Sequence, residues 1–149
     1  MEKILLAVDG SSSSKKAADK VAEMAKTMQA EVTILTVVEA HDIKLREVEA
    51  YIPDKTIEEL REINKKEMKK KGQEILNDAV KHFKDIDVKI KKEIQYGDPA
   101  DTICEFAEKN DMDMIVLADK GVGGIKRFFL GSITEKVVRH AKGSVLIVK

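Results

Sequence analysis

The chain has 149 residues, enough for one domain whose core buries about two-thirds of the unfolded surface. Its 27 basic and 27 acidic residues cancel, so no overall field favours nucleic acid or an anionic membrane, and no apolar run is long enough to cross a bilayer. Cys104 is the only cysteine, which excludes an internal disulfide and indicates a reducing, cytoplasmic setting. We expect a single domain over residues 1–149.

The first half of the chain alternates between strand and helix patterns. Residues 4–8 and 32–38 are short apolar runs, typical of strands buried on both faces of a sheet. Between them, small apolar residues recur at helical spacing from Ala17 to Ala25.

A long helical pattern follows, from about Thr56 to Phe83. We expect its apolar residues, among them Leu60 and Ile63, to share one face, and Gly72 could break the helix into two pieces. The segment 41–71 is dense in charge, and we interpret it as a solvated linker and exposed helix face. The alternative is a mobile lid over the loops at the end of the sheet.

The second half continues the alternation. Residues 88–94 alternate apolar with charged side chains, as in a half-exposed edge strand, and 97–99 form a turn into a helix. Residues 114–117 predict a strand, 132–140 a helix and 144–148 a last strand. Strands that alternate with helices indicate an α/β fold, a three-layer α/β/α sandwich with a mostly parallel sheet. In such sheets ligands bind beyond the carboxyl ends of the strands.

The loop after residue 117 carries the strongest functional pattern. It is rich in glycine and ends in Gly131-Ser132 at the start of a helix, where unpaired N–H groups and the helix dipole favour a phosphate. The loop is no P-loop, because Gly131 is followed by serine and not lysine, and no dinucleotide fingerprint, because Lys126 stands where a third small residue is needed.

The same residues have a second interpretation. Ser132-x-x-Glu135 has the spacing of a capping box, which satisfies the first N–H groups of a helix without a ligand. Glu135 would also repel a phosphate unless Lys120, Lys126 or Arg127 offsets its charge.

The spacing of these glycines resembles the signature of the universal stress protein family, Gly-x-x-Gly, nine residues, then Gly-Ser/Thr. Gly121 and Gly131-Ser132 match it with the nine-residue gap intact, and the likeness extends over the whole chain. Ala118 departs from it, since nucleotide-binding members have glycine there. A Cβ at this position costs little if φ is negative, but forces the loop to reshape if φ is positive.

The resemblance implies a Rossmann-like sheet of five strands in the order 3-2-1-4-5, similar to the adenine nucleotide alpha hydrolases, and a regulatory stress-response module that binds ATP, with Mg²⁺ accompanying the nucleotide. It puts Asp9, Ala7, Val8 and Val37 at the adenine. The ribose and phosphate positions that it implies are Leu117, Ala118, Gly121, Gly131, Ser132, Ile133 and Thr134.

The resemblance also implies a homodimer through the strand 144–148 and a regulatory protein partner. No metal-ligand cluster and no nucleophile–base–acid set is visible, so we expect at most slow ATP hydrolysis. The alternative is a protein-interaction dimer of the same fold that binds no nucleotide. An enzyme of the wider hydrolase group is a weaker option.

Overall fold

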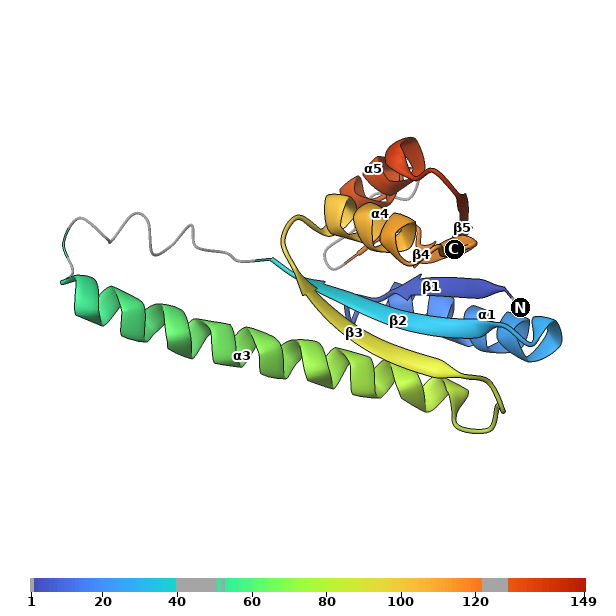
Figure 1. Ribbon diagram of the computed structural model, residues 1–149, viewed down its shortest axis with the longest axis horizontal. Coiled ribbons are helices and arrows are strands. Elements are labelled where there is room, and N and C mark those ends of the chain that lie inside the picture. The colour runs from blue at the N-terminus through green and yellow to red at the C-terminus, as the bar shows by residue number, and fades with distance from the viewer. Residues whose placement is uncertain (1, 40–50, 52, 122–128) are drawn as a thin grey trace.

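The computed structural model describes residues 2–39, 51, 53–121 and 129–149. Its strands form one sheet in the order β3-β2-β1-β4-β5, which confirms the expected order (Figure 1). Every pairing is parallel, where the sequence led us to expect a mostly parallel sheet. The strands are β1 (Lys3–Ala7), β2 (Glu31–Val38), β3 (Ile90–Tyr96), β4 (Met114–Ala118) and β5 (Ser144–Val148).

Helices cover both faces of the sheet, so the three-layer architecture is confirmed (Figure 1). The helices are α1 (Ser12–Met28), α3 (Asp54–Val80), the short 3-10 helix η2 (Lys81–Phe83), α4 (Pro99–Lys109) and α5 (Ser132–His140). Side chains alternate along the strands, so Leu6 and Ile34 pack with α1 and α3, while Leu5 and Leu35 pack with α4 and α5. None of the helices in the described ranges is long and apolar enough to span a membrane.

The helix α3 runs through Gly72 without a break, so the division that this glycine could have caused does not occur. Gly72 is buried, and a Cβ built on it would lie 3.4 Å from side-chain atoms of Val38 and Ile94. These are ordinary packing distances, so an alanine would fit at this position. The packing of the buried face of α3 against the sheet offsets the cost of about 1 kcal/mol that glycine carries inside a helix relative to alanine.

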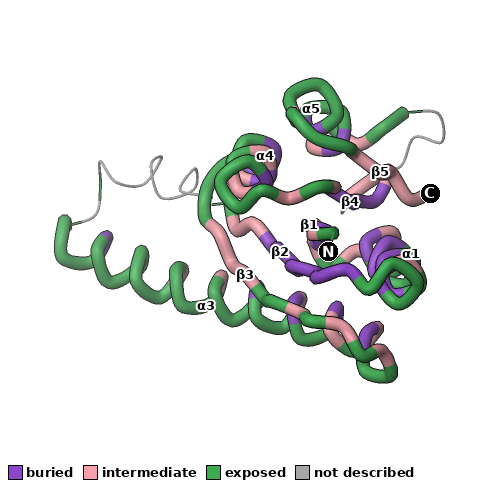
Figure 2. Tube along the Cα trace, turned by 45° about the vertical axis from the view of Figure 1, so that its right-hand side comes forward, coloured by how far each residue is buried: buried purple, intermediate pink, exposed green. Residues whose placement is uncertain are grey.

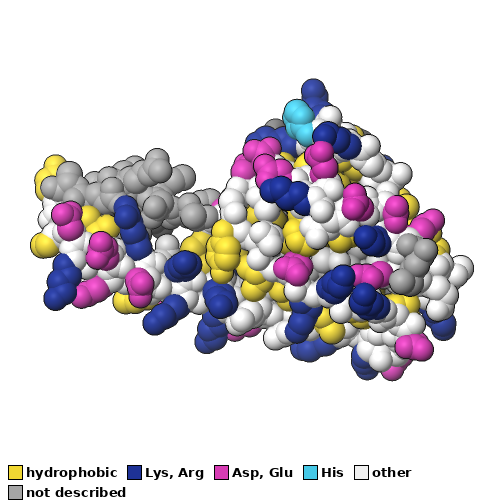
Figure 3. All heavy atoms as spheres, viewed as in Figure 1, with side chains coloured by type: hydrophobic (Ala, Val, Ile, Leu, Met, Phe, Trp, Pro, Cys, Tyr) yellow, Lys and Arg dark blue, Asp and Glu magenta, His cyan; other side chains and the backbone are white. Residues whose placement is uncertain are grey.

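The first half of α3 extends beyond the sheet (Figure 1). Leu60 and Ile63 lie there and are 38% and 56% exposed, so the apolar face of α3 is not buried along its whole length. Charged side chains line this half of the helix, as expected for an exposed helix face (Figure 3). Residues 40–50 and 52 lie outside the described residues, and the lid alternative stays untested.

Several strand boundaries differ by one or two residues from those expected. β1 ends at Ala7 and not Val8, because a turn follows in which Gly10 has a φ of +82°. β3 begins at Ile90 and not Val88, because the amide of Val88 donates to the carbonyl of Ile86 in a turn. The prediction that β3 is an edge strand is confirmed, and its half-exposed residues contrast with buried β2 beside it (Figure 2).

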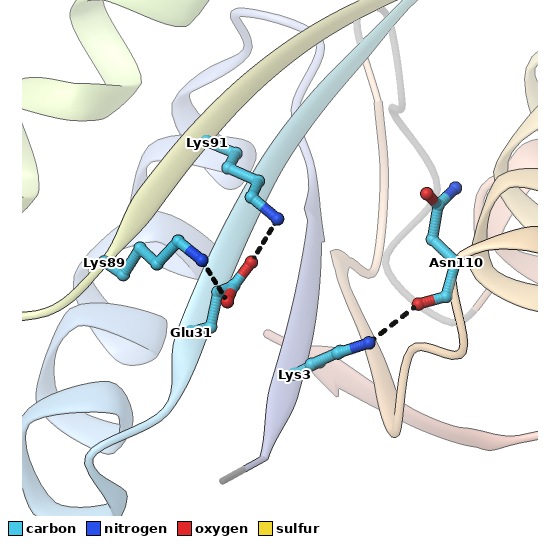
Figure 4. Close-up of polar contacts among 5 residues, drawn as sticks. All are labelled: Lys3, Glu31, Lys89, Lys91 and Asn110. Atoms are coloured by element: carbon cyan, nitrogen blue, oxygen red, sulfur yellow. Dashed lines mark hydrogen bonds and ion pairs between the residues drawn. The ribbon is translucent and has the colours of Figure 1, made fainter.

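An ion-pair cluster joins β2 and β3 where both strands begin (Figure 4). The Glu31 carboxylate lies 2.5 Å from the Lys91 ammonium and 3.0 Å from that of Lys89. Hydrogen bonds from Lys91 and then Lys89 lower the pKa of Glu31 to about 2. Near it, the Lys3 ammonium donates to the carbonyl of Asn110. Ion pairs and a hydrogen bond therefore join neighbouring segments at the end of the sheet where the strands begin.

Candidate functional site

A cleft opens where β1, β2 and β4 end, beside the first turns of α4 and α5. Its empty space is about 550 Å³ when the volume is counted out to the open solvent. The fold brings together, around this cleft, residues that sequence analysis drew from separate segments. Those that line it are Ala7, Val8, Asp9, Val37, Leu117, Ala118, Gly121, Ile133 and Thr134.

Further lining residues were missed by the sequence analysis as members of the binding set. They are Ser14, Leu35, Pro99, Ile103 and Lys120. Leu35 lies on the same face of β2 as Val37, so the period of two along a strand was a usable signal. Ile103 follows Pro99 by about one turn of α4, so helical spacing was another. Because the sequence analysis did not include these residues, it did not predict how apolar the lining of the cleft is.

The helix α5 begins one residue earlier than a capping box requires. Gly131 is the N-cap, Ser132 is already helical, and no side chain within the described residues caps the helix. Glu135 does not reach back, because its carboxylate lies 2.8 Å from the Arg139 guanidinium. The capping-box interpretation is therefore wrong. The first N–H groups of α5 keep their capacity to bind an anion.

The ion pair between Glu135 and Arg139 also weakens the expected repulsion between Glu135 and a phosphate, because the Arg139 charge opposes that of Glu135. Lys126 and Arg127, named above for that role, lie outside the described residues.

Asp9 is positioned by the turn that follows β1. Its carboxylate accepts a hydrogen bond of 2.9 Å from the amide of Ser11, the residue that caps α1. A Cβ built on Gly121 would lie 2.7 Å from the other carboxylate oxygen of Asp9. A side chain at position 121 would therefore force the Asp9 carboxylate to move, whether or not a ligand is bound.

Gly131 has a similar local reason to be glycine. Its amide donates to the carbonyl of Asp119 at 2.7 Å, and a Cβ built on it would lie 3.2 Å from the Cα of Lys120. The N-cap of α5 thus rests directly on the backbone of the loop that follows β4. Gly131 and Ser132 do not line the cleft themselves but set the start of α5 beside it.

The backbone conformation of Ala118 decides whether its Cβ strains the loop. It is the last residue of β4, paired with Val148 of β5, and it is not among the residues with positive φ. The backbone here is extended, so the Cβ introduces no conformational strain. Its carbonyl accepts a buried hydrogen bond of 2.8 Å from the hydroxyl of Thr134, which ties α5 to β4.

A model of the universal stress protein family matches residues 1–149. The chain belongs to this family. It is 34% identical over 149 residues to universal stress protein YxiE of Bacillus subtilis (strain 168), covering 99% of this chain and 98% of that protein. It is 36% identical over 148 residues to universal stress protein MJ0531 of Methanocaldococcus jannaschii, with coverage of 99% and 82%.

Solved universal stress protein structures have the same fold. The structure of MJ0577, from Methanocaldococcus jannaschii, matches with a TM-score of 0.82 and 28% identity, covering 99% of this chain and 95% of that one. A universal stress protein in complex with cAMP matches with a TM-score of 0.67 and 24% identity, covering 99% and 96%. A family protein from Arabidopsis thaliana with AMP bound matches with a TM-score of 0.69 and 22% identity, covering 100% and 92%. At identities below 25% the last two show the fold alone, and the nucleotides belong to those proteins.

Proposed function

We propose that this universal stress protein binds an adenine nucleotide, ATP with Mg²⁺ foremost, in the cleft at the ends of β1, β2 and β4. One observation carries the proposal: an apolar cleft adjoins a helix N-terminus that no described side chain caps. A planar base needs apolar walls and a phosphate chain needs donors, and the two lie side by side here. The nucleotides bound by two structural neighbours add support.

The ligand would lie along the cleft in one direction. The base would occupy the apolar end, near Leu35 and Val37, with Asp9 at its edge. The phosphates would receive N–H groups and the Ser132 hydroxyl from the first turn of α5. Mg²⁺ would be held mainly by phosphate oxygens and water, as is usual for this ion.

We infer a binding module and not a fast enzyme. Asp9 is the carboxylate that lines the described cleft, and the Ser11 amide already holds one of its oxygens. A residue so engaged is poorly placed to activate an attacking water. Occupancy of the cleft would instead regulate the binding of a protein partner, in keeping with a stress-response module.

Mass spectrometry of nucleotide released from natively purified protein, followed by calorimetric titration with ATP and Mg²⁺, tests the proposal. Copurified ATP or AMP, or saturable binding, would support it. The absence of both, together with no thermal shift at millimolar ATP and Mg²⁺, would overturn it.

Ser132→Ala is the informative variant, because Ser132 is exposed and makes no cap, so the fold should survive. We expect ATP to bind several-fold more weakly to it, by about the free energy of one hydrogen bond to a charged group. Ser144→Ala, at an exposed serine that starts β5, is the matched control. Gly131 variants are poor tests, because a Cβ there disturbs the loop directly.

We further propose a homodimer in which the free edges of two β5 strands pair. β5 is the last strand of the sheet, and an open edge presents unpaired N–H and C=O groups to a second copy. The carbonyl of Val148 accepts from Asp119, so Val148 faces β4 and the amide of Ile147 points to the open edge.

Ile147→Pro tests the dimer, because proline removes an outward N–H and leaves the ladder to β4 intact. Light scattering should find a dimer for the wild type and for Ile147→Ala, but a folded monomer for Ile147→Pro. A monomeric wild type, or a dimeric Ile147→Pro protein, would count against this arrangement.

A further inference from the structure

Lys120 is a half-buried lysine that no described residue neutralises. It lies in the loop after β4 and lines the cleft, and no hydrogen bond or ion pair joins its ammonium to another residue of the described chain. Many other lysines of the described chain have partners, such as Lys109 with Glu105 and Lys142 with Glu108. The Lys120 ammonium is therefore available to an anion that enters the cleft.

The backbone of Lys120 is in contact with the start of α5. A Cβ built on Gly131, the N-cap, would lie 3.2 Å from the Cα of Lys120, and the Gly131 amide donates to the preceding residue, Asp119. The lysine side chain and the first N–H groups of α5 therefore start from adjoining backbone. A single phosphate group is small enough to engage both.

The other charged group of the described cleft is Asp9. Lys120 brings a positive charge to the cleft, beside the positive end of α5. The effect of removing Lys120 should therefore grow with the charge of the ligand, because the Coulomb energy is proportional to it.

We propose that Lys120 determines which nucleotides this site accepts, favouring nucleoside 5′-phosphates with a dianionic terminal phosphate over nucleosides and over 3′,5′-cyclic nucleotides. The inference rests on the proposed function of the cleft. A terminal phosphate carries two charges and can turn toward the ammonium, whose three donors suit its oxygens. A cyclic phosphodiester carries one charge and is tied to the ribose at both ends, so it gains less from the lysine.

Calorimetric titration with adenosine, AMP, ATP and cAMP at fixed ionic strength tests this on the wild type, Lys120→Gln and Lys120→Arg. The control is Lys109→Gln, which makes the same charge change at an exposed lysine on the last turn of α4, the end farther from the cleft. We expect Lys120→Gln to bind AMP and ATP roughly 10- to 100-fold more weakly, the size of a lost charge-assisted contact. Adenosine should change by less than about twofold and cAMP by less than AMP, while Lys120→Arg retains most of the affinity.

An equal loss for adenosine and AMP, or no loss for AMP, would overturn the role of Lys120. Inorganic pyrophosphate, titrated into the same variants, separates this inference from the proposed function. If no adenine compound binds but pyrophosphate binds in a Lys120-dependent way, the nucleotide proposal fails and the role of Lys120 in phosphate selection stands. If adenine nucleotides bind equally to Lys120→Gln and to the wild type, the Lys120 proposal fails alone. If neither pyrophosphate nor any adenine compound binds, both fail.

Discussion

One buried hydrogen bond holds the start of α5 against the end of β4, and its removal has a calculable effect. The Thr134 hydroxyl donates to the carbonyl of Ala118 at 2.8 Å, and both residues are buried. Thr134→Val keeps the shape of the side chain but leaves that carbonyl without its donor. A buried polar group that loses its partner costs about 1–3 kcal/mol. In a domain of this size the melting temperature should fall by roughly 2–12 °C.

A matched substitution exists on β2. Thr33 is 1% exposed, and its hydroxyl has no hydrogen-bond partner among the described residues. Thr33→Val makes the same chemical change but removes an unpaired buried hydroxyl, so no partner is orphaned. We expect the free energy of unfolding to stay the same or to rise by up to about 2 kcal/mol.

Urea unfolding followed by circular dichroism measures both variants. The m-values should match the wild type, which shows that the two-state comparison holds. The reasoning is refuted if Thr134→Val unfolds within about 0.5 kcal/mol of the wild type, the scatter of neutral substitutions, or if Thr33→Val loses as much stability as Thr134→Val.

Three further predictions concern positions away from the cleft floor. Glu31 has its pKa lowered to about 2, so its ion pairs stabilise the fold fully above the ordinary value of 4.5 and lose that effect as the pH falls from 4.5 toward 2. In acid titrations the wild type should therefore lose stability more steeply over that window than Glu31→Gln, and parallel curves would contradict the assignment. Leu76→Ala on the buried face of α3 should cost about 2–5 kcal/mol, while Leu60→Ala on the extended half should cost under about 1 kcal/mol in the same denaturant assay. Gly131→Ala should destabilise the fold by about 1–3 kcal/mol, because its Cβ would meet backbone atoms at 3.2 Å. Gly143→Ala should be tolerated, because the nearest atoms to its Cβ would lie at 3.7 Å. Equal melting temperatures of the two variants would contradict this prediction.

The sequence predicted where helices and strands lie better than it predicted which of their residues are buried. The bounds of α5 and β5 were predicted as the structure has them, because a helical apolar pattern after Gly131 and a short apolar run mark them locally. The continuous helix at Gly72 and the exposure of Ile63 could not be settled from the sequence. Helical periodicity shows which residues share a face, but not whether a sheet lies opposite that face. Gly72 is buried against the sheet, whereas Ile63 lies on the extended half of α3 and is 56% exposed.

The start of α5 shows a second limit. Ser132-x-x-Glu135 has the spacing of a capping box, yet the helix takes Gly131 as its N-cap. The hydrogen bond from Gly131 to Asp119 fixes that choice, and its two partners are separated by the loop. Local spacing cannot anticipate a contact made across a loop, so the open helix end could be recognised only in the folded chain.

Hydrogen bonds within the protein hold the residues around the cleft in position without a ligand. The Ser11 amide holds the Asp9 carboxylate, Gly131 is bonded to Asp119, and the hydroxyl of Thr134 fixes the first turn of α5. Because these groups are already ordered, binding of a ligand would cost little free energy for ordering them. This preorganisation favours binding to the described part of the site, and it means that variants of the ligand-facing groups can be interpreted as changes in contact energy. Ser132 and Lys120 are such groups, since neither side chain takes part in the bonds that hold the cleft together.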